Sequence, residues 1–349
     1  MNTSQEIMAT RNGEKQIAYW LLAVCAAIFF MIVLGGVTRL THSGLSMVEW
    51  EPIMGIVPPL NQAEWEATFE KYKQFPEYQL NLDMDLDGFK SIFFLEYVHR
   101  VWGRMIGLLF LLPFLYFLVK GYIKKPMMPK MVIMFVLGGL QGVMGWYMVK
   151  SGLVNDPQVS QYRLTVHLTA AFVIYAYIFW TAMNLLFTRP KPHVIDARPL
   201  QRFAWWVTGL LSVTIISGGF VAGLKAGLAY NTFPLMDGHF IPHNMFALEP
   251  WYRNFFDNIA AVQFDHRLLA EISLLLVAAL WFVSRRYHLT ARARTAFHLL
   301  LAMTGVQVIL GVATLLLVVP TWLGATHQGG AVVLFTLALN VNHALLTDR

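Results

Sequence analysis

Two short stretches place a histidine and an arginine at the opening of a long apolar segment. Glu96, His99 and Arg100 open the first, and His266-Arg267 opens a later one. Ionisable side chains inside a membrane span are costly, so they usually mark a functional site. Because residues three apart share one face of a helix, Glu96 lies one turn from His99. The first stretch therefore offers a carboxylate beside an imidazole.

The composition describes a membrane protein. Of the 349 residues, 57% are hydrophobic and 13% are charged, about half the roughly 25% charged fraction of a soluble protein. A water-soluble core cannot accommodate that much apolar surface, so we predict an all-α integral membrane protein that contacts lipid and no nucleic acid. Cys25 is the single cysteine, which excludes an intrachain disulfide and a thiolate zinc or iron–sulfur site.

Eight segments have close to the ~20 residues that cross a bilayer as a helix. They are Ile17–Thr38, Phe93–Leu118, Met131–Val149, Tyr162–Phe187, Phe203–Leu224, Ala261–Ser284, Thr295–Val318 and Trp322–Leu346. With the N-terminus inside, the inner loops and ends hold 15 of the 26 lysines and arginines. This distribution satisfies the positive-inside rule. We therefore predict that both termini are cytoplasmic.

Two outer loops are long, Arg39–Ile92 and Lys225–Ala260. In the first of them, Asn61-Gln62-Ala63-Glu64 has the pattern of a helix N-cap followed by its acidic partner. Aromatic residues follow at helical spacing, which predicts an amphipathic helix on the outer surface. Loops of this length are usually functional or disordered. Their aromatic residues and prolines favour ordered lids.

The second half of the chain repeats features of the first. The matched pairs are Gly35-Gly36 with Gly218-Gly219, His99-Arg100 with His266-Arg267, Gly139-x-Gln141-x-x-x-Gly145 with Gly305-x-Gln307-x-x-x-Gly311, and His167 with His327. Four spans per repeat bring both halves into the membrane the same way up. We predict two pseudo-symmetric four-helix bundles, residues 1–190 and 191–349, with the glycines at close helix contacts.

Four of the eleven histidines fall inside spans near the outer surface: His99, His167, His266 and His327. Each half places two of them at one level on antiparallel helices, an arrangement that suits the two axial positions of a haem iron. The alternative is four core histidines hydrogen-bonded between helices, but their matched positions favour haem. A zinc or copper site would need further close ligands, and no other histidine or cysteine recurs at that depth.

Arginines accompany these histidines. Arg100, Arg104, Arg163 and Arg267 lie within about two helical turns of them. Haem propionates near the membrane surface need cationic side chains at the depth of these arginines. We therefore expect these arginines to hold propionates.

The two halves differ in one carboxylate. Glu96 stands three residues before His99, whereas Gln263 stands three residues before His266. A carboxylate buried beside an apolar macrocycle could act as an acid or a base near neutral pH; the alternative is an ion pair with Arg100. The difference predicts that one haem reacts and the other relays electrons.

Several motifs together resemble the heme A synthase family over nearly the whole chain. They are Gly35-Gly36-Val37-Thr38-Arg39-Leu40-Thr41 with Ser43-Gly44-Leu45-Ser46, Glu96-Tyr97-Val98-His99-Arg100-Val101-Trp102-Gly103-Arg104, His167, Ala229-Tyr230-Asn231-Thr232-Phe233-Pro234-Leu235-Met236, His266-Arg267 and Thr326-His327-Gln328. Some members carry cysteine pairs in outer loops. This chain, with Cys25 alone, is similar to the branch shared by Gram-negative bacteria and mitochondria.

The resemblance implies oxidation of a methyl group of haem O to a formyl group, through successive hydroxylations, to give haem A for terminal oxidases. It implies haem O as substrate between His99 and His167, Glu96 as the catalytic acid, and a resident haem b between His266 and His327. Arg39 lies in the first motif and joins the supporting arginines.

The same resemblance implies a multi-pass protein of the bacterial inner membrane with its haem sites near the periplasmic face. Partners would be the farnesyltransferase that makes haem O, oxidase assembly factors and an electron acceptor that the sequence does not identify.

Two other classes of protein would also use paired histidines. A di-haem b-type electron carrier would usually place haems near both membrane faces, whereas these four histidines lie near one face. A haem exporter or chaperone would bind haem without converting it. Analysis of the bound pigments separates both from an enzyme.

Overall fold

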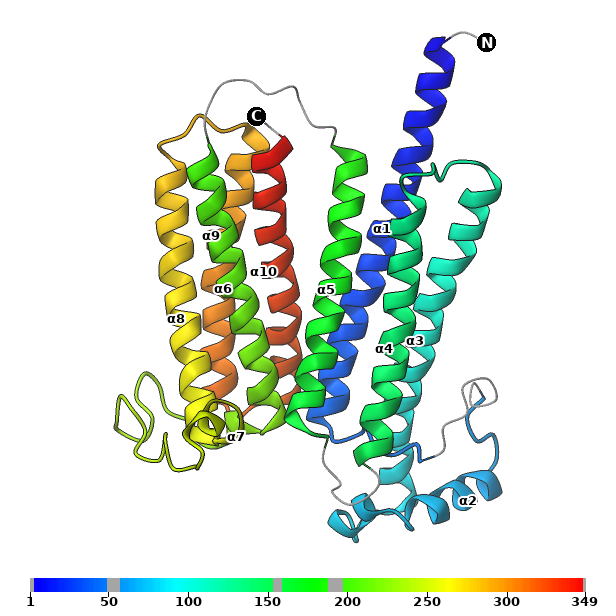
Figure 1. The fold of residues 1–349 in the computed structure, drawn as a ribbon. Helices are drawn as coiled ribbons and strands as arrows, with labels where there is room; N and C mark the ends of the chain where they lie inside the picture. Colours follow the sequence, from blue (N-terminus) through cyan, green and yellow to red (C-terminus); the bar gives the residue numbers. More distant parts are fainter. Residues whose placement is uncertain (1–2, 49–56, 153–158, 188–196, 348–349) are drawn as a thin grey trace.

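A computed structural model describes residues 3–48, 57–152, 159–187 and 197–347, and long helices make up most of it (Figure 1). The helices long and apolar enough to cross a membrane are α1 (Thr3–Leu40), α3 (Leu86–Val119), α4 (Met128–Gly152), α5 (Gln161–Leu186), α6 (Arg198–Gly223), α8 (Ile259–Ser284), α9 (Ala291–Leu316) and α10 (Thr321–Thr347). The predicted all-α membrane protein with eight spans is confirmed.

Shorter elements connect these spans. They are α2 (Gln62–Tyr72), the 3-10 turns η1 (Pro76–Leu80), η2 (Ala226–Leu228) and η3 (Trp251–Arg253), and α7 (Asn254–Asp257). Figure 1 shows α2 and α7 at one face of the bundle, here called the loop face, and the start of α1 and the end of α10 at the opposite face. An even number of spans requires this arrangement of the termini.

Several helices begin earlier than the hydropathy predicts, because capping side chains fix the first turn. α3 begins at Leu86, seven residues before the expected Phe93, where Asp85 accepts a hydrogen bond from the Gly88 amide at 2.8 Å. The Asn258 side chain caps α8 in the same way, through the Ala260 amide at 2.9 Å. A capping side chain satisfies backbone N–H groups that the helix itself leaves unpaired.

The predicted helix after Asn61 is also present as α2. The Asn61 side chain accepts from the Glu64 amide at 3.0 Å, and the Glu64 carboxylate accepts from the Leu60 amide at 2.7 Å. The apolar face of α2 packs on the start of α3, with Phe69 against Phe89 at 5.0 Å between ring centres. α2 therefore covers the start of α3.

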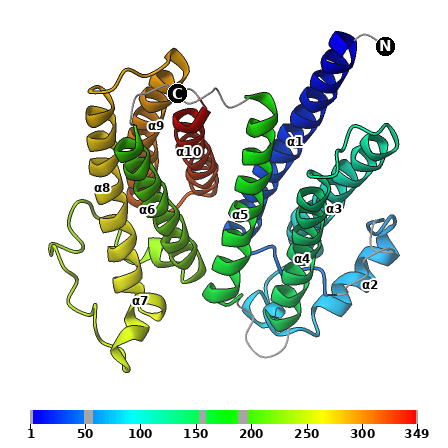
Figure 2. The ribbon, with the colours of Figure 1, turned by 45° about the horizontal axis from the view of Figure 1, so that its top comes forward.

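Helix contacts follow two closed circuits (Figures 1 and 2). In one, α1 packs on α3, α3 on α4, α4 on α5 and α5 on α1; in the other, α6, α8, α9 and α10 pack in the same order. The predicted boundary at residues 190 and 191 lies outside the described residues. The pseudo-symmetric relation of the two bundles stays a prediction.

The two circuits meet where α1 packs on α10 and α5 packs on α6. Glycines make these contacts close. The Gln328 side chain lies against Gly36 and donates to the Ile32 carbonyl at 2.8 Å. Arg39 donates to the Gly223 carbonyl at 2.9 Å, which joins the loop-face ends of α1 and α6.

Replacement of Gly223 by alanine should loosen this junction. A Cβ there would lie 2.5 Å from Cβ and 2.6 Å from Cα of Gln161, so α5 and α6 would have to move apart. We expect Gly223→Ala to lower the free energy of unfolding by roughly 1–3 kcal/mol, measured by thermal unfolding in detergent. Gly209→Ala on the same helix, with nothing within 4 Å, is the control and should not destabilise. Equal stabilities would contradict the tight junction.

Candidate functional site

Each of the four span histidines lies near the loop face and against a glycine of a neighbouring helix. His167 and His327 are the seventh residues of α5 and α10, and His266 is the eighth of α8. A Cβ built on the facing glycine would lie 3.0 to 3.7 Å from Cε1 of the imidazole. The pairs are Gly35 with His99, Gly145 with His167, Gly218 with His266, and Gly311 with His327.

These contacts correct the interpretation of the repeated glycines. The sequence predicted that the glycines bring helix backbones together. Gly36, Gly219 and Gly223 do serve such contacts, since their neighbours are Gln328, Thr165 and Gln161 on other helices. The four glycines that face histidines instead leave room for imidazole rings. A β-carbon at Gly35, Gly218 or Gly311 would crowd the ring, because real Cβ contacts are seldom closer than 3.4 Å, whereas at Gly145 it would make an ordinary contact at 3.7 Å.

Two matched glutamines hold the histidine backbones. Gln141 on α4 donates to the His167 carbonyl at 3.1 Å, and Gln307 on α9 donates to the His327 carbonyl at 2.8 Å. An amide side chain in a membrane span needs an internal partner. Both glutamines find theirs on a histidine of the adjacent helix, so each half fixes its fourth span in the same way.

The imidazole nitrogens differ in their surroundings. The Nδ1 atom of His266 lies 2.8 Å from the Ser217 hydroxyl, which leaves its Nε2 for another partner. The Nδ1 atoms of His99, His167 and His327 are buried without a hydrogen-bond partner among the described residues. Buried polar atoms are seldom left unpaired in proteins. These rings therefore have capacity for a ligand.

The geometry of the second pair fits a shared iron atom. The ring centres of His266 and His327 are 6.5 Å apart, with their planes at 89°. Two nitrogens about 2 Å from one metal atom leave the ring centres roughly 6 Å apart, because each centre lies about 1 Å behind its nitrogen. In the first half, His99 lies within electrostatic range of His167. The donor set, the spacing and the glycine surfaces fit bis-imidazole haem binding.

Glu96 is buried and fully hydrogen-bonded. Its Oε2 atom accepts from the Ser46 amide at 2.7 Å, the Ser46 hydroxyl at 2.8 Å and the Met47 amide at 2.9 Å. Its Oε1 atom accepts from Arg100 Nε at 3.1 Å and from Nη2 at 2.5 Å. A carboxylate offers about four acceptor positions, so these donors occupy all of them. The predicted alternative, an ion pair with Arg100, is present.

The second half builds the same clamp with a neutral amide. Arg267 donates to the carbonyls of Tyr230 at 2.7 Å and Thr232 at 2.8 Å, and to Gln263 Oε1 at 3.2 Å. Gln263 also donates to the Ala226 carbonyl at 2.9 Å. In each half, a pair of residues four apart therefore ties the loop that follows the first span to the second span.

The remaining predicted arginines make different contacts. Arg39 joins the two halves, as described above. Arg104 follows Arg100 by one turn on α3, and Arg163 lies over the Tyr147 ring at 4.9 Å. The Arg100 guanidinium also donates to the Met47 carbonyl at 2.8 Å. Their assignment to haem propionates stays a prediction.

Ser46 and Ser217 are site residues whose roles the sequence did not reveal. Ser46 stands in the quoted motif Ser43-Gly44-Leu45-Ser46, so a signal was present, but its partner Glu96 is 50 residues away. Ser217 directly precedes the repeated Gly218, and the matching residue before Gly35 is Leu34. A difference between the repeats at this position could have indicated a different histidine environment.

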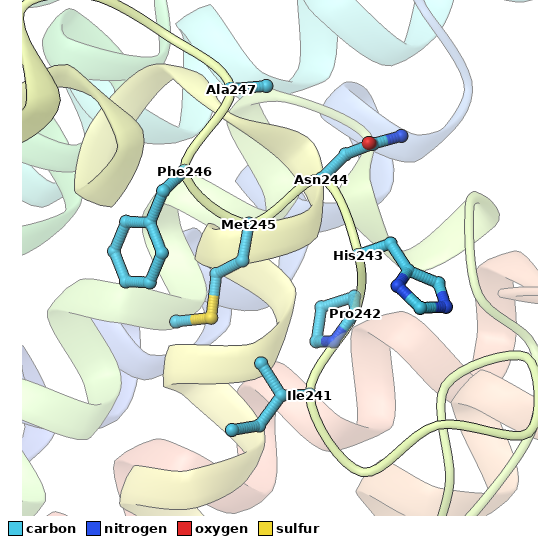
Figure 3. A pocket seen from close by; sticks show the side chains of 7 residues that line it. All are labelled: Ile241, Pro242, His243, Asn244, Met245, Phe246 and Ala247. Carbon is cyan, nitrogen blue, oxygen red and sulfur yellow. The ribbon is translucent and has the colours of Figure 1, made fainter.

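A pocket also opens in the second outer loop (Figure 3). Its lining is the continuous run from Ile241 to Ala247, with His243 among the side chains drawn. None of the four span histidines lines it. The pocket therefore belongs to the loop and not to the histidine sites.

Comparison with known proteins identifies the family. A family model described as cytochrome oxidase assembly protein matches residues 18–339. Proteins named heme A synthase from Nitrosospira multiformis and Nitrosomonas eutropha are 57% and 55% identical, over 334 and 332 residues. These alignments cover 95% and 94% of this chain, and 94% and 93% of the relatives.

A human relative extends the comparison beyond bacteria. The protein named heme A synthase COX15 is 46% identical over 340 residues, which cover 95% of this chain and 83% of the human protein. The family resemblance predicted from the sequence motifs is confirmed. The chain belongs to the cytochrome oxidase assembly family, in which these relatives are named heme A synthases.

Proposed function

We propose that this chain is a heme A synthase, a membrane oxidoreductase that oxidises a methyl group of haem O to a formyl group and so makes haem A. Identity of 45% to 57% with proteins of that name along nearly the whole chain is the observation that carries the proposal. The two pairs of glycine-backed histidines, one in each half, support it.

The two halves take different haems. Residues 1–190 bind haem O through His99 and His167, and residues 191–349 bind haem b through His266 and His327. Bound haem b supplies one-electron transfer. The supporting difference is that a carboxylate stands one turn before the histidine in the first half and an amide in the second.

Glu96 acts through its charge. Five hydrogen bonds occupy its acceptor positions and hold the carboxylate in one orientation. Such a fixed anion stabilises positive charge that develops on a nearby carbon, without reorganisation during the reaction. A general base would need an open position for the incoming proton. Ser46, Met47 and Arg100 therefore favour charge stabilisation over proton abstraction by Glu96.

The protein lies in a bacterial inner membrane, with both termini in the cytoplasm and the loop face toward the periplasm. The distribution of basic residues supports this orientation. The partners that we propose are the farnesyltransferase that makes haem O, oxidase assembly factors and an external electron acceptor. All four histidines lie near the loop face, which disfavours a carrier that moves electrons across the membrane.

Replacement of Glu96 by glutamine tests the role of its charge. Glutamine keeps an acceptor for Ser46 and Met47 but removes the negative charge. We expect Glu96→Gln to retain its haem b spectrum and to lose haem A formation by on the order of 10²–10³-fold, measured by pigment chromatography. Asp87→Asn, an exposed site on the same helix, is the control and should form haem A normally. Unchanged haem A yield in Glu96→Gln would remove Glu96 from the mechanism.

Histidine substitutions test the assignment of the halves. We expect His266→Ala to lose the resident haem b, because one of its two axial ligands is gone. His99→Ala should keep haem b and lose turnover. The haem-to-protein ratio and the haem A yield of both purified variants decide this. If His99→Ala instead loses the resident haem, the assignment is reversed.

The glycine surface of the second site can be tested separately. A Cβ on Gly311 would lie 3.0 Å from His327 Cε1, so the imidazole has to rotate or shift. We expect Gly311→Ala to purify with less haem b and an altered low-spin iron spectrum. Gly305→Ala on the same helix, with nothing within 4 Å, should match the wild type. Identical spectra for both variants would show that the glycine is not needed for the ring.

A further inference from the structure

An aromatic cap covers Glu96 on the loop face. It consists of Phe69 and Tyr72 on α2 and Phe89 and Phe93 on α3, all buried. Phe93 precedes Glu96 by one turn, and Met47, whose amide donates to Glu96, packs against the cap. The cap therefore lies between the Glu96 carboxylate and the water at the loop face.

A second carboxylate is buried beside this cap. Glu77, in η1, is 6% exposed, and its Oε2 atom has no hydrogen-bond partner among the described residues. The Tyr72 hydroxyl is also buried and makes no hydrogen bond of acceptable geometry in the described chain, although the Asn81 amide lies nearby. Unpaired buried polar atoms cost stability, so they call for a functional reason.

The surroundings of Glu77 favour its protonated form. Burial, and then the negative charge of Glu96, raise the pKa of Glu77 to about 8. A group with such a pKa gains and loses a proton close to physiological pH. The oxygen atoms of Glu96 already accept five hydrogen bonds. Of these two carboxylates, Glu77 is the one with an open oxygen.

We propose that Glu77 accepts the protons that leave the first-half site and passes them to water at the loop face. This inference rests on the proposed function, with water as the oxygen donor: each hydroxylation breaks one C–H bond of the methyl group and one O–H bond of water and forms one C–O bond. It releases two protons and two electrons, and the electrons pass to the external electron acceptor. An O–H bond forms on Glu77 as the proton arrives and breaks as outside water takes it, so the carboxylate is regenerated. Glu77 is a proton-transfer residue that does not touch the substrate.

Several charged or titratable groups surround Glu77, whose own pKa is raised by burial to about 8. The charged or titratable groups around it in the described chain are Tyr72 and Tyr78, Glu96 with Arg100, and the Glu70–Lys73 ion pair at the end of α2. Burial raises the pKa of Tyr72 above its usual range. A step in activity near pH 8 would therefore report Glu77.

The test compares wild type, Glu77→Gln, Glu77→Asp and the control Glu70→Gln, each loaded with haem. Since Glu77 must lose its proton before it accepts another, wild-type kcat should rise as pH passes about 8. Glu77→Gln should give a flat profile that meets the wild type near pH 6 and lies on the order of 10²-fold below it at pH 9. Glu77→Asp should restore part of the rise, and Glu70→Gln should follow the wild type.

Infrared titration gives a second measurement that does not need turnover. The wild-type spectrum should contain a protonated carboxylic acid band that disappears as pH rises through about 8, and Glu77→Gln should lack it. A constant rate ratio between wild type and Glu77→Gln at every pH, or a wild type without this band, would overturn the proposal. A wild type that binds haem but forms no haem A overturns the proposed function as well, whereas a Glu77→Gln variant that forms haem A at the wild-type rate at pH 9 overturns the proton route alone.

Discussion

Polar groups inside a membrane must find their partners within the protein, and this constraint governs the whole structure. Several polar side chains of the site region are tied to a backbone group of another helix or loop. Gln141 and Gln307 hold histidine carbonyls, while Arg100 and Arg267 hold loop carbonyls. These bonds fix the ends of the spans at the loop face. Among the described residues, the Nδ1 atoms of His99, His167 and His327 have no hydrogen-bond partner.

The same constraint explains why the two halves look alike and still differ at one position. Each half uses one clamp of two residues four apart, one glutamine on the third span and two glycine-backed histidines. The first clamp contains the carboxylate of Glu96 and the second contains the amide of Gln263. Because an anion in low dielectric exerts a strong field, this one difference is the basis on which we propose a reactive site in the first half and an electron relay in the second. The scaffold can stay common to both.

Much of this could be predicted from the sequence because hydropathy and repetition are local signals. The eight spans, the α2 cap at Asn61 and the four histidines could all be read from composition and spacing. The beginnings of α1 and α3 could not, because capping and polar helix turns lie outside the apolar run. The sequence left two alternatives open for Glu96, an acid or base role and an ion pair with Arg100. Ser46 comes to that carboxylate from 50 residues away through folding of the outer loop.

The role of the repeated glycines shows a further limit. A glycine in a membrane span is compatible with close packing of a neighbouring helix, with a groove that faces lipid, or with space for an imidazole ring. The sequence alone favoured the first for all of them. The residues on the facing helix determine which role a glycine has. They differ between Gly35, which faces His99, and Gly36, which faces Gln328. Adjacent glycines therefore serve different halves of the molecule.

Because Gly35 and Gly36 contact different halves of the molecule, the position of a mutation in the sequence does not show which half it disturbs. Gln328 directly follows His327 and rests against Gly36 of the first span. A bulkier residue at Gly36 would push on α10, which carries His327, a residue that we propose as a haem b ligand. On that proposal, the damage would register in the spectrum of a haem bound in the opposite bundle. The location of a lesion along the chain is thus a poor guide to the redox centre that fails.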